Sequence, residues 1–100
     1  MANNLYISEF EQIIRTTVGN VVAAQCPPHA QQKVDFTAGA TQSAAFNVRT
    51  KFVRLHAEAI CSVAFGSNPT ATNAMLRLTA GQTEYFGVNA GDKLSVITNT

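Results

Sequence analysis

Few residues of this chain have the type and spacing that chemistry requires, and His56 and Glu58 form the best-placed pair. They are two positions apart in an alternating run, so a strand would hold both on one face about 7 Å apart. Such a pair could contribute to a metal site, but that site needs further ligands, and the other histidine, His29, belongs to a proline-containing loop. We therefore favour a solvated strand face on which Arg54 pairs with Glu58 across His56.

The remaining reactive side chains do not form a catalytic set. Cys61 falls on the apolar side of the alternating run, where a cysteine behaves as a small buried hydrophobe, and Cys26 is expected to be an unpaired thiol. No serine lies in a Gly-x-Ser-x-Gly elbow. The carboxylates are each expected to be solvated or to cap other groups: Glu9, Glu11, Asp35, Glu58, Glu84 and Asp92. We predict no catalytic residue, no metal, no cofactor and no enzymatic activity.

The overall composition argues against several classes of partner. Charged residues make up 13% of the chain, against about 25% in an average soluble domain, and the formal net charge is +1. The seven Lys and Arg residues are scattered, which argues against nucleic acid binding through phosphate contacts. No segment approaches the roughly 18 apolar residues of a membrane span, and the first residues lack the pattern of a signal peptide. We expect a protein made in a cytosol, with no nucleic acid and no membrane partner.

The alternating run indicates which element would position these residues. Odd positions from 53 to 65 are apolar and most even positions are polar, which is the pattern of a strand with one buried face. This pattern places Arg54 and Ser62 on the solvent side. Because the run exceeds the usual strand length of about five or six residues, and because Ile60 is apolar on the polar side, we expect a bend or bulge near residues 58–60.

Short apolar runs separated by Gly, Asn and Pro continue on both sides of this run. We predict about eight strands, near residues 4–8, 33–37, 42–47, 52–58, 60–66, 75–79, 83–88 and 93–98. Such strands suit an all-β fold, an antiparallel β-sandwich of the jelly-roll type, and the absence of Trp argues against an immunoglobulin domain. Within one domain, we expect an N-terminal arm and proline-containing linker over residues 1–32 and the β-sandwich over residues 33–100.

The N-terminal segment leaves two structures open. Ser8 and Glu11 match a helix capping box, and apolar residues with helical spacing follow, so residues 8–19 could form a helix. β-branched residues and the Gly19-Asn20 pair favour an extended arm with a hairpin equally well. In either structure the apolar side chains must lie against the sheet or against a neighbouring subunit. The candidate partner-interface residues are Leu5, Tyr6, Ile7, Phe10, Ile13, Ile14 and Val18.

Four stretches of the chain are distinctive as strings: residues 52–66 (FVRLHAEAICSVAFG), 68–72 (NPTAT), 78–88 (LTAGQTEYFGV) and 91–97 (GDKLSVI). Together they resemble a family of small virion proteins encoded among the head genes of tailed bacteriophages, and residues 5–10 and 41–46 extend the resemblance more loosely. Some small phage proteins of this kind are capsid cement or decoration proteins with jelly-roll folds. The resemblance implies a virion protein, made in the host cytoplasm, that binds the major capsid protein or other virion proteins.

The leading hypothesis is a non-enzymatic capsid cement protein that stabilises the head shell as a homo-oligomer, a dimer or a trimer. One alternative is a different virion part, such as a head-completion, tail or fibre-associated module. A second alternative is a small cupin-like protein that binds a metal ion or a sugar. Locating the chain in purified particles separates the first two, and metal analysis of the isolated protein tests the third.

Overall fold

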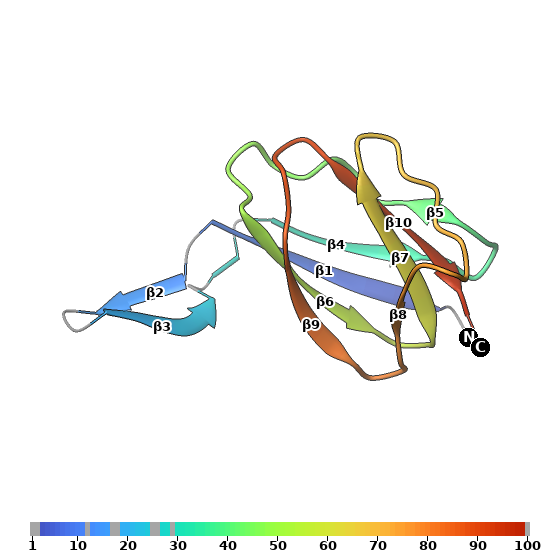
Figure 1. Ribbon diagram of the computed structural model, residues 1–100, viewed down its shortest axis with the longest axis horizontal. Helices are drawn as coiled ribbons and strands as arrows, with labels where there is room; N and C mark the ends of the chain where they lie inside the picture. Colours follow the sequence, from blue (N-terminus) through green and yellow to red (C-terminus); the bar gives the residue numbers. More distant parts are fainter. Residues whose placement is uncertain (1–2, 12, 17–18, 25–26, 29, 100) are drawn as a thin grey trace.

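The protein folds into two antiparallel sheets with a separate hairpin beside them (Figure 1). The computed structural model describes residues 3–11, 13–16, 19–24, 27–28 and 30–99; in 13–16 and 19–24 it describes the backbone alone. Every regular element in these ranges is a strand, which confirms the predicted all-β sandwich. In chain order the strands are β1 (Asn4–Phe10), β2 (Ile13–Thr16), β3 (Gly19–Ala24), β4 (Ala30–Asp35), β5 (Thr41–Gln42), β6 (Phe52–Ala57), β7 (Cys61–Gly66), β8 (Leu76–Leu78), β9 (Thr83–Gly87) and β10 (Lys93–Thr98).

The strand order is that of a jelly roll with its connections permuted. The first sheet has the order β4-β1-β6-β9 and the second has the order β5-β10-β7-β8. From β4 onward, the strands are distributed between the two sheets as in a jelly roll. In an unpermuted jelly roll the last strand of the chain would lie between the strands that correspond to β4 and β6. Here the first strand, β1, occupies that position. This order requires Asn3 and Thr98 to lie close together. Both contact Phe36: its N–H donates to the Asn3 carbonyl at 2.9 Å, and Thr98 Oγ1 donates to its carbonyl at 3.5 Å. Figure 1 shows the two ends of the chain side by side.

The core lies between the two sheets and follows from the alternation of apolar residues. Val53 and Leu55 of β6, and Cys61 and Val63 of β7, are all at most 1% exposed. Full burial of an aliphatic side chain stabilises a fold by about 1.5–3 kcal/mol. The bend predicted near residues 58–60 is confirmed, and at this bend the chain crosses from the first sheet to the second. One alternating run therefore supplies apolar side chains from both sides of the core.

The predicted boundary between an arm and the sandwich is wrong for residues 4–10. β1 pairs with β4 on one side and with β6 on the other, so it is a central strand of the first sheet. β4 begins at Ala30, which also places the end of the expected linker inside the sandwich. Sheet pairing of β1 on both edges, with Leu5 and Ile7 buried, outweighs the local capping signal of Ser8 and Glu11, and no helix forms at residues 8–10.

Of the two structures left open for residues 8–19, the extended one with a hairpin is observed. β2 and β3 pair with each other and with no other described strand, and Gly19, which we expected in a turn, is the first residue of β3 opposite Thr16. The link between these strands, residues 17–18, lies outside the described residues. Figure 1 shows that the hairpin extends away from the sandwich along the long axis of a molecule with extents of 46 × 26 × 23 Å.

The strand predicted over residues 42–47 is shortened to β5, because a buried carboxylate holds the segment that follows. Glu9 is 3% exposed, and its Oε1 accepts hydrogen bonds from Thr50 Oγ1 at 2.7 Å and from Asn47 N at 2.8 Å. Gln32 extends the network, since its Nε2 donates to Glu9 Oε2 at 3.4 Å and its Oε1 accepts from Ala44 N at 2.9 Å. The prediction that Glu9 is solvated is therefore wrong. Its carboxylate caps donors on residues that are distant in the sequence, as the alternative prediction of a capping group allows.

Candidate functional site

The first sheet carries polar side chains on the face opposite the core. Directly opposed residues of antiparallel strands point to the same face, so the register of β4, β1 and β6 places side chains in rows across the sheet. Two such rows are Lys33-Tyr6-His56 and Gln31-Ser8-Arg54. We call the surface formed by these two rows the open face.

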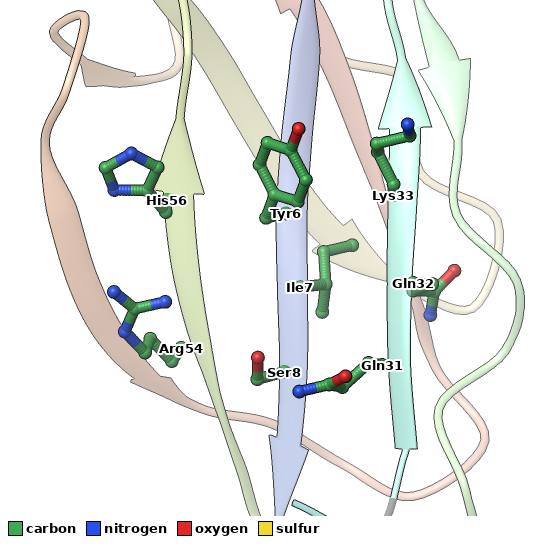
Figure 2. A pocket seen from close by; sticks show the side chains of 8 residues that line it. All are labelled: Tyr6, Ile7, Ser8, Gln31, Gln32, Lys33, Arg54 and His56. Atoms are coloured by element: carbon green, nitrogen blue, oxygen red, sulfur yellow. The ribbon is translucent and has the colours of Figure 1, made fainter.

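The open face contains a shallow hollow of about 670 Å³ (Figure 2). Ser8 lines one end of it, between Gln31 on β4 and Arg54 on β6, and Tyr6 lines the other end. Because the serine side chain is short and its neighbours are long, Ser8 lies at the bottom of the hollow. Within the part of the chain that the structure describes, no hydrogen bond or ion pair engages the side chains of Ser8, Lys33 or Arg54. The hollow therefore presents polar groups that are available to a ligand.

One end of the open face is closed by a carboxylate network. Tyr6 Oη donates a hydrogen bond to Glu58 Oε1 at 2.9 Å, and Asn4 Nδ2 donates to Oε2 at 3.2 Å. The hydrogen bond from Tyr6, with a smaller contribution from Asn4, lowers the pKa of the Glu58 carboxyl, and the same bond raises the pKa of Tyr6. The predicted Arg54–Glu58 pair is therefore wrong, because β1 pairs with β6 and brings Tyr6 to Glu58 first.

His56 is oriented by protein groups. Its Nδ1 lies 2.7 Å from Thr83 Oγ1 on β9, and its ring centre lies 6.5 Å from that of Tyr6. His29, the other histidine considered for a metal site, lies outside the described residues. Among the residues that are described, no three His, Cys, Asp or Glu side chains gather closely enough to hold a metal ion. The described geometry around His56 is that of a hydrogen-bonded surface residue.

Aromatic rings occupy the other end of the same face. Phe10 stacks on Phe52 with ring centres 5.4 Å apart and an interplanar angle of 17°, and Phe52 lies 6.3 Å from Tyr85. Tyr85 is 54% exposed, whereas Phe10 is buried. The hollow thus lies on the strands between a tyrosine–carboxylate network and an aromatic cluster.

Three of the predicted partner-interface residues are not available to a partner. Leu5 and Ile7 are at most 1% exposed, and Phe10 is 4% exposed, so all three pack inside this chain. They were predicted as an interface because the first strand was assigned to an arm, and they are buried because β1 is part of the sheet. Tyr6 is 38% exposed and remains accessible on the open face.

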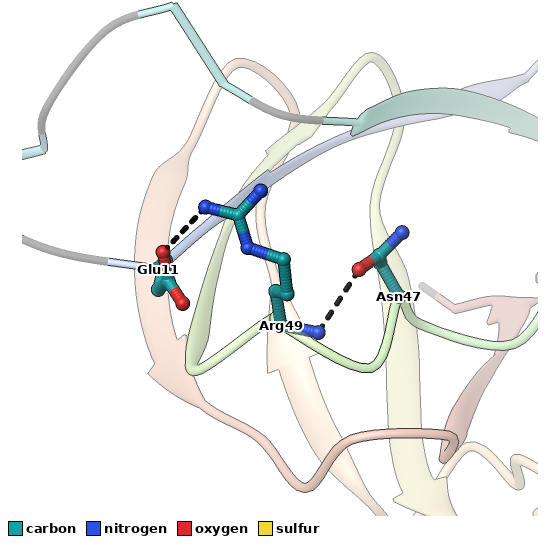
Figure 3. Close-up of polar contacts among 3 residues, drawn as sticks. All are labelled: Glu11, Asn47 and Arg49. Atoms are coloured by element: carbon teal, nitrogen blue, oxygen red, sulfur yellow. Dashed lines mark hydrogen bonds and ion pairs between the residues drawn. The ribbon is translucent and has the colours of Figure 1, made fainter.

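The other predicted interface residues belong to the hairpin. Ile13 and Ile14 are in β2, where the side chains are not described, and Val18 lies outside the described residues. The base of the hairpin is tied to the sandwich: Arg49 Nη2 donates to Glu11 Oε1 at 2.8 Å, while the Arg49 N–H donates to Asn47 Oδ1 at 2.9 Å (Figure 3). The hydrogen bond to Glu11 raises the pKa of Arg49.

The outer face of the second sheet is covered by the chain itself. Residues 67–75 pass over it between β7 and β8, and the Ala71 N–H donates to Ser95 Oγ at 3.0 Å (Figure 1). Asn99 Nδ2 donates to Ser62 Oγ at 2.7 Å and to the Asn73 carbonyl at 3.0 Å. Ser62 is 0% exposed, so its predicted position on a solvated face is wrong, and the reason is this covering loop.

Sequence reasoning missed the hollow, because Gln31, Ser8 and Arg54 come from strands that only the fold brings together. The polar residues at alternate positions of β1 and β6 were the available signal for an outward face. No described helix has the length and apolar composition needed to cross a membrane. Neither a protein-family model, nor a curated protein, nor a solved structure matches this chain.

Proposed function

We propose that this protein is a non-enzymatic structural component of a tailed-phage virion that acts as a cement protein on the head shell. The resemblance of residues 52–66 and 78–88 to small head-gene products supports a virion role. The β-sandwich, with a hairpin beside it, supports a protein that works by contact with neighbours. The proposal assigns no catalytic group, because the described residues gather no nucleophile, base and orienting group at one place.

The hairpin is the observation that carries this proposal. β2 and β3 form a two-stranded sheet that pairs with no other described strand and extends beyond the sandwich (Figure 1). An isolated two-stranded ribbon is at best marginally stable in water, so an extended hairpin needs a surface to complete it. Its strand sequences, IIRT and GNVVAA, are rich in β-branched apolar residues. We take a neighbouring subunit or the shell as that surface.

A cement protein stabilises a shell by mass action, because anything that binds the assembled state and not its separated parts shifts the equilibrium toward assembly. A dimer or trimer would place several hairpins on one shell, and linked contacts bind more tightly than any one of them. The sandwich needs to supply only a rigid body between contacts. The tie between Arg49 and Glu11 supports this arrangement, since it connects the base of the hairpin to that body.

Sedimentation with purified empty head shells of the phage that encodes this chain tests the proposal. Removing the hairpin is straightforward, because Glu9 of β1 lies opposite Ala30 of β4 and a short Gly-Asn turn can join the two strands. The full chain should sediment with shells and the hairpin-deleted chain should not, although both unfold cooperatively. Leu76→Ser, a polar substitution at an exposed position of β8, serves as the control and should sediment normally.

Two results would contradict the proposal. If the hairpin-deleted chain occupies shells as fully as the full chain does, the hairpin is not the contact. If surface labelling of particles finds the chain only at the neck or tail, the head-completion or tail alternative replaces the cement role. Metal that binds stoichiometrically to the isolated protein and is lost in His56→Ala would support the cupin-like alternative instead.

A further inference from the structure

We propose that the open face binds a carboxylate group on an extended acidic segment of a partner protein. Arg54 makes the main contact, and Ser8 and Gln31 flank it as hydrogen-bond donors. The inference adds the chemistry of a partner to the virion role proposed above, and its biological setting rests on that role. The binding itself is a property of the isolated chain and is tested on it.

Charge complementarity supports an anionic ligand. The carboxylates of the open-face side of the sheet already have partners within the chain: Glu58 accepts hydrogen bonds from Tyr6 and Asn4, and Asp35 Oδ1 accepts from the Thr37 N–H at 2.9 Å. The hydrogen bonds from Thr37 and Tyr6 lower the pKa values of Asp35 and Glu58, and the charge of Lys33 makes a smaller contribution to both. Arg54 is therefore the cation of this face that no described group neutralises.

The types of donor around Ser8 suit a carboxylate. A guanidinium group presents parallel N–H bonds that match the two oxygens of a carboxylate, and such charge-assisted pairs are stronger than neutral hydrogen bonds. Arg54 and Gln31 lie on opposite sides of Ser8, with their backbones roughly 10 Å apart across two strand spacings. A ligand group resting on Ser8 can thus receive hydrogen bonds from both sides.

The size of the face favours a segment over a folded partner. Three strands spaced about 4.8 Å apart and about six residues long span roughly 10 by 17 Å, which is far below the roughly 800 Å² that each partner contributes to a standard interface. A second copy of the chain, held by this face alone, would therefore bind too weakly. Tyr6 at 38% exposure and Tyr85 at 54% exposure can pack against the aliphatic parts of a bound segment.

The test is a titration of the isotope-labelled full chain, followed by the shifts of its backbone amide resonances. The probe is the peptide acetyl-Gly-Glu-Gly-Glu-Gly-amide at low ionic strength, with the matching Gln peptide as the neutral control. We expect saturable shifts confined to residues 6–8, 31–33 and 54–56 with the acidic peptide. The Gln peptide should produce none.

Two variants and a matched control sharpen the assignment. Arg54→Gln should weaken binding about tenfold, which is the order expected for one charge-assisted pair. Ser8→Asp should abolish binding, because it places a carboxylate in the hollow. Arg77→Gln, at an exposed position of β8 on the second sheet, should leave the affinity unchanged. Dispersed amide spectra of both open-face variants will show that each is folded.

Several results would overturn the inference. These are equal weakening by Arg54→Gln and Arg77→Gln, binding of the Gln peptide, and tighter competition by inorganic phosphate or glucuronate than by the Glu peptide. The inference and the virion role can fail separately. A chain that ignores the Glu peptide but sediments with shells refutes the carboxylate site alone, whereas a chain that binds the peptide but not shells refutes the virion role alone.

Discussion

The two sheets of the sandwich differ in what covers their outer faces. On the second sheet, Ser62 and Ser95 point outward from neighbouring strands, yet they are 0% and 1% exposed because residues 67–75 lie over them. On the first sheet, Ser8 also points outward from the middle of the sheet, but it lies at the bottom of an accessible hollow. A serine that points outward from a strand is therefore buried under a loop on the second sheet and accessible on the first sheet.

The difference follows from which outer face has a loop to pair its serine hydroxyls. A buried serine hydroxyl needs hydrogen-bond partners: the covering loop supplies the Ala71 N–H to Ser95, and Asn99, which follows β10, donates to Ser62. No described segment crosses the open face, and its unpaired donors are accessible to water. One outer face thus adds buried contacts to the fold, and the other is accessible.

The largest expected difference in stability is between an aspartate substitution on the covered face and the same substitution on the open face. Ser95→Asp should lower the free energy of unfolding by about 3 kcal/mol or more, because the loop leaves no water for the new carboxylate. Ser8→Asp should change it by less than about 1 kcal/mol, because the hollow is wet and Arg54 is near. Urea denaturation of both variants measures the difference, and equal effects would show that the two faces are not distinct.

Thiol reactivity tests how tightly the core between the two sheets is closed. Burial raises the pKa of the Cys61 thiol from 9.0 to about 11, so at pH 8 roughly 100-fold less thiolate should react than in the unfolded chain. Because the pKa is raised on folding, the contribution of this thiol to stability is complete below pH 9.0 and is lost as the pH rises toward about 11. Reaction with an aromatic disulfide reagent in a Cys26→Ser background measures this protection, and rapid labelling of native protein would contradict it.

Removing the hydrogen bonds through which Asn99 holds the covering loop should have a smaller effect on stability. Asn99→Ala removes the hydrogen bonds to Ser62 Oγ and the Asn73 carbonyl, and it should lower the free energy of unfolding by about 1–2 kcal/mol. Amide exchange at Ala71 should accelerate as the loop loosens. Asn89→Ala, in an exposed turn far from this network, is the control and should leave both quantities nearly unchanged.

The smallest expected effect comes from breaking the hydrogen bond between Tyr6 and Glu58 at one end of the open face. Tyr6→Phe removes the hydrogen bond that lowers the pKa of Glu58, so this pKa should move up toward its ordinary value. A lowered pKa gives stability that is present above the pKa of the unfolded chain and is lost as the pH falls through the folded value. The variant should therefore lose less stability on acidification. Carbon-detected titration of the Glu58 carboxyl measures the change, and an unaltered pKa would refute the role of Tyr6.

Much of the fold could be predicted from local pattern. The strands over residues 52–57, 61–66 and 93–98 were predicted within one residue, because their alternation is long and the flanking turns contain Gly, Asn or Pro. β1 was placed correctly but assigned to an arm, since seven residues of alternation cannot show that a strand is paired on both sides. The candidate site was predicted only as a set of polar residues around His56, and its members Ser8 and Gln31 were missed.

By itself the sequence determined which residues of β6 and β7 face the core, because the alternation of side chains along a strand is a local property of the backbone. Only the tertiary structure decided which strands are neighbours, and therefore that Ser8 lies beside Arg54, that Glu9 holds residues 47 and 50, and that a loop covers Ser95. Strand pairing joins segments that are distant in the chain, and its outcome depends on how all strands bury their apolar faces together.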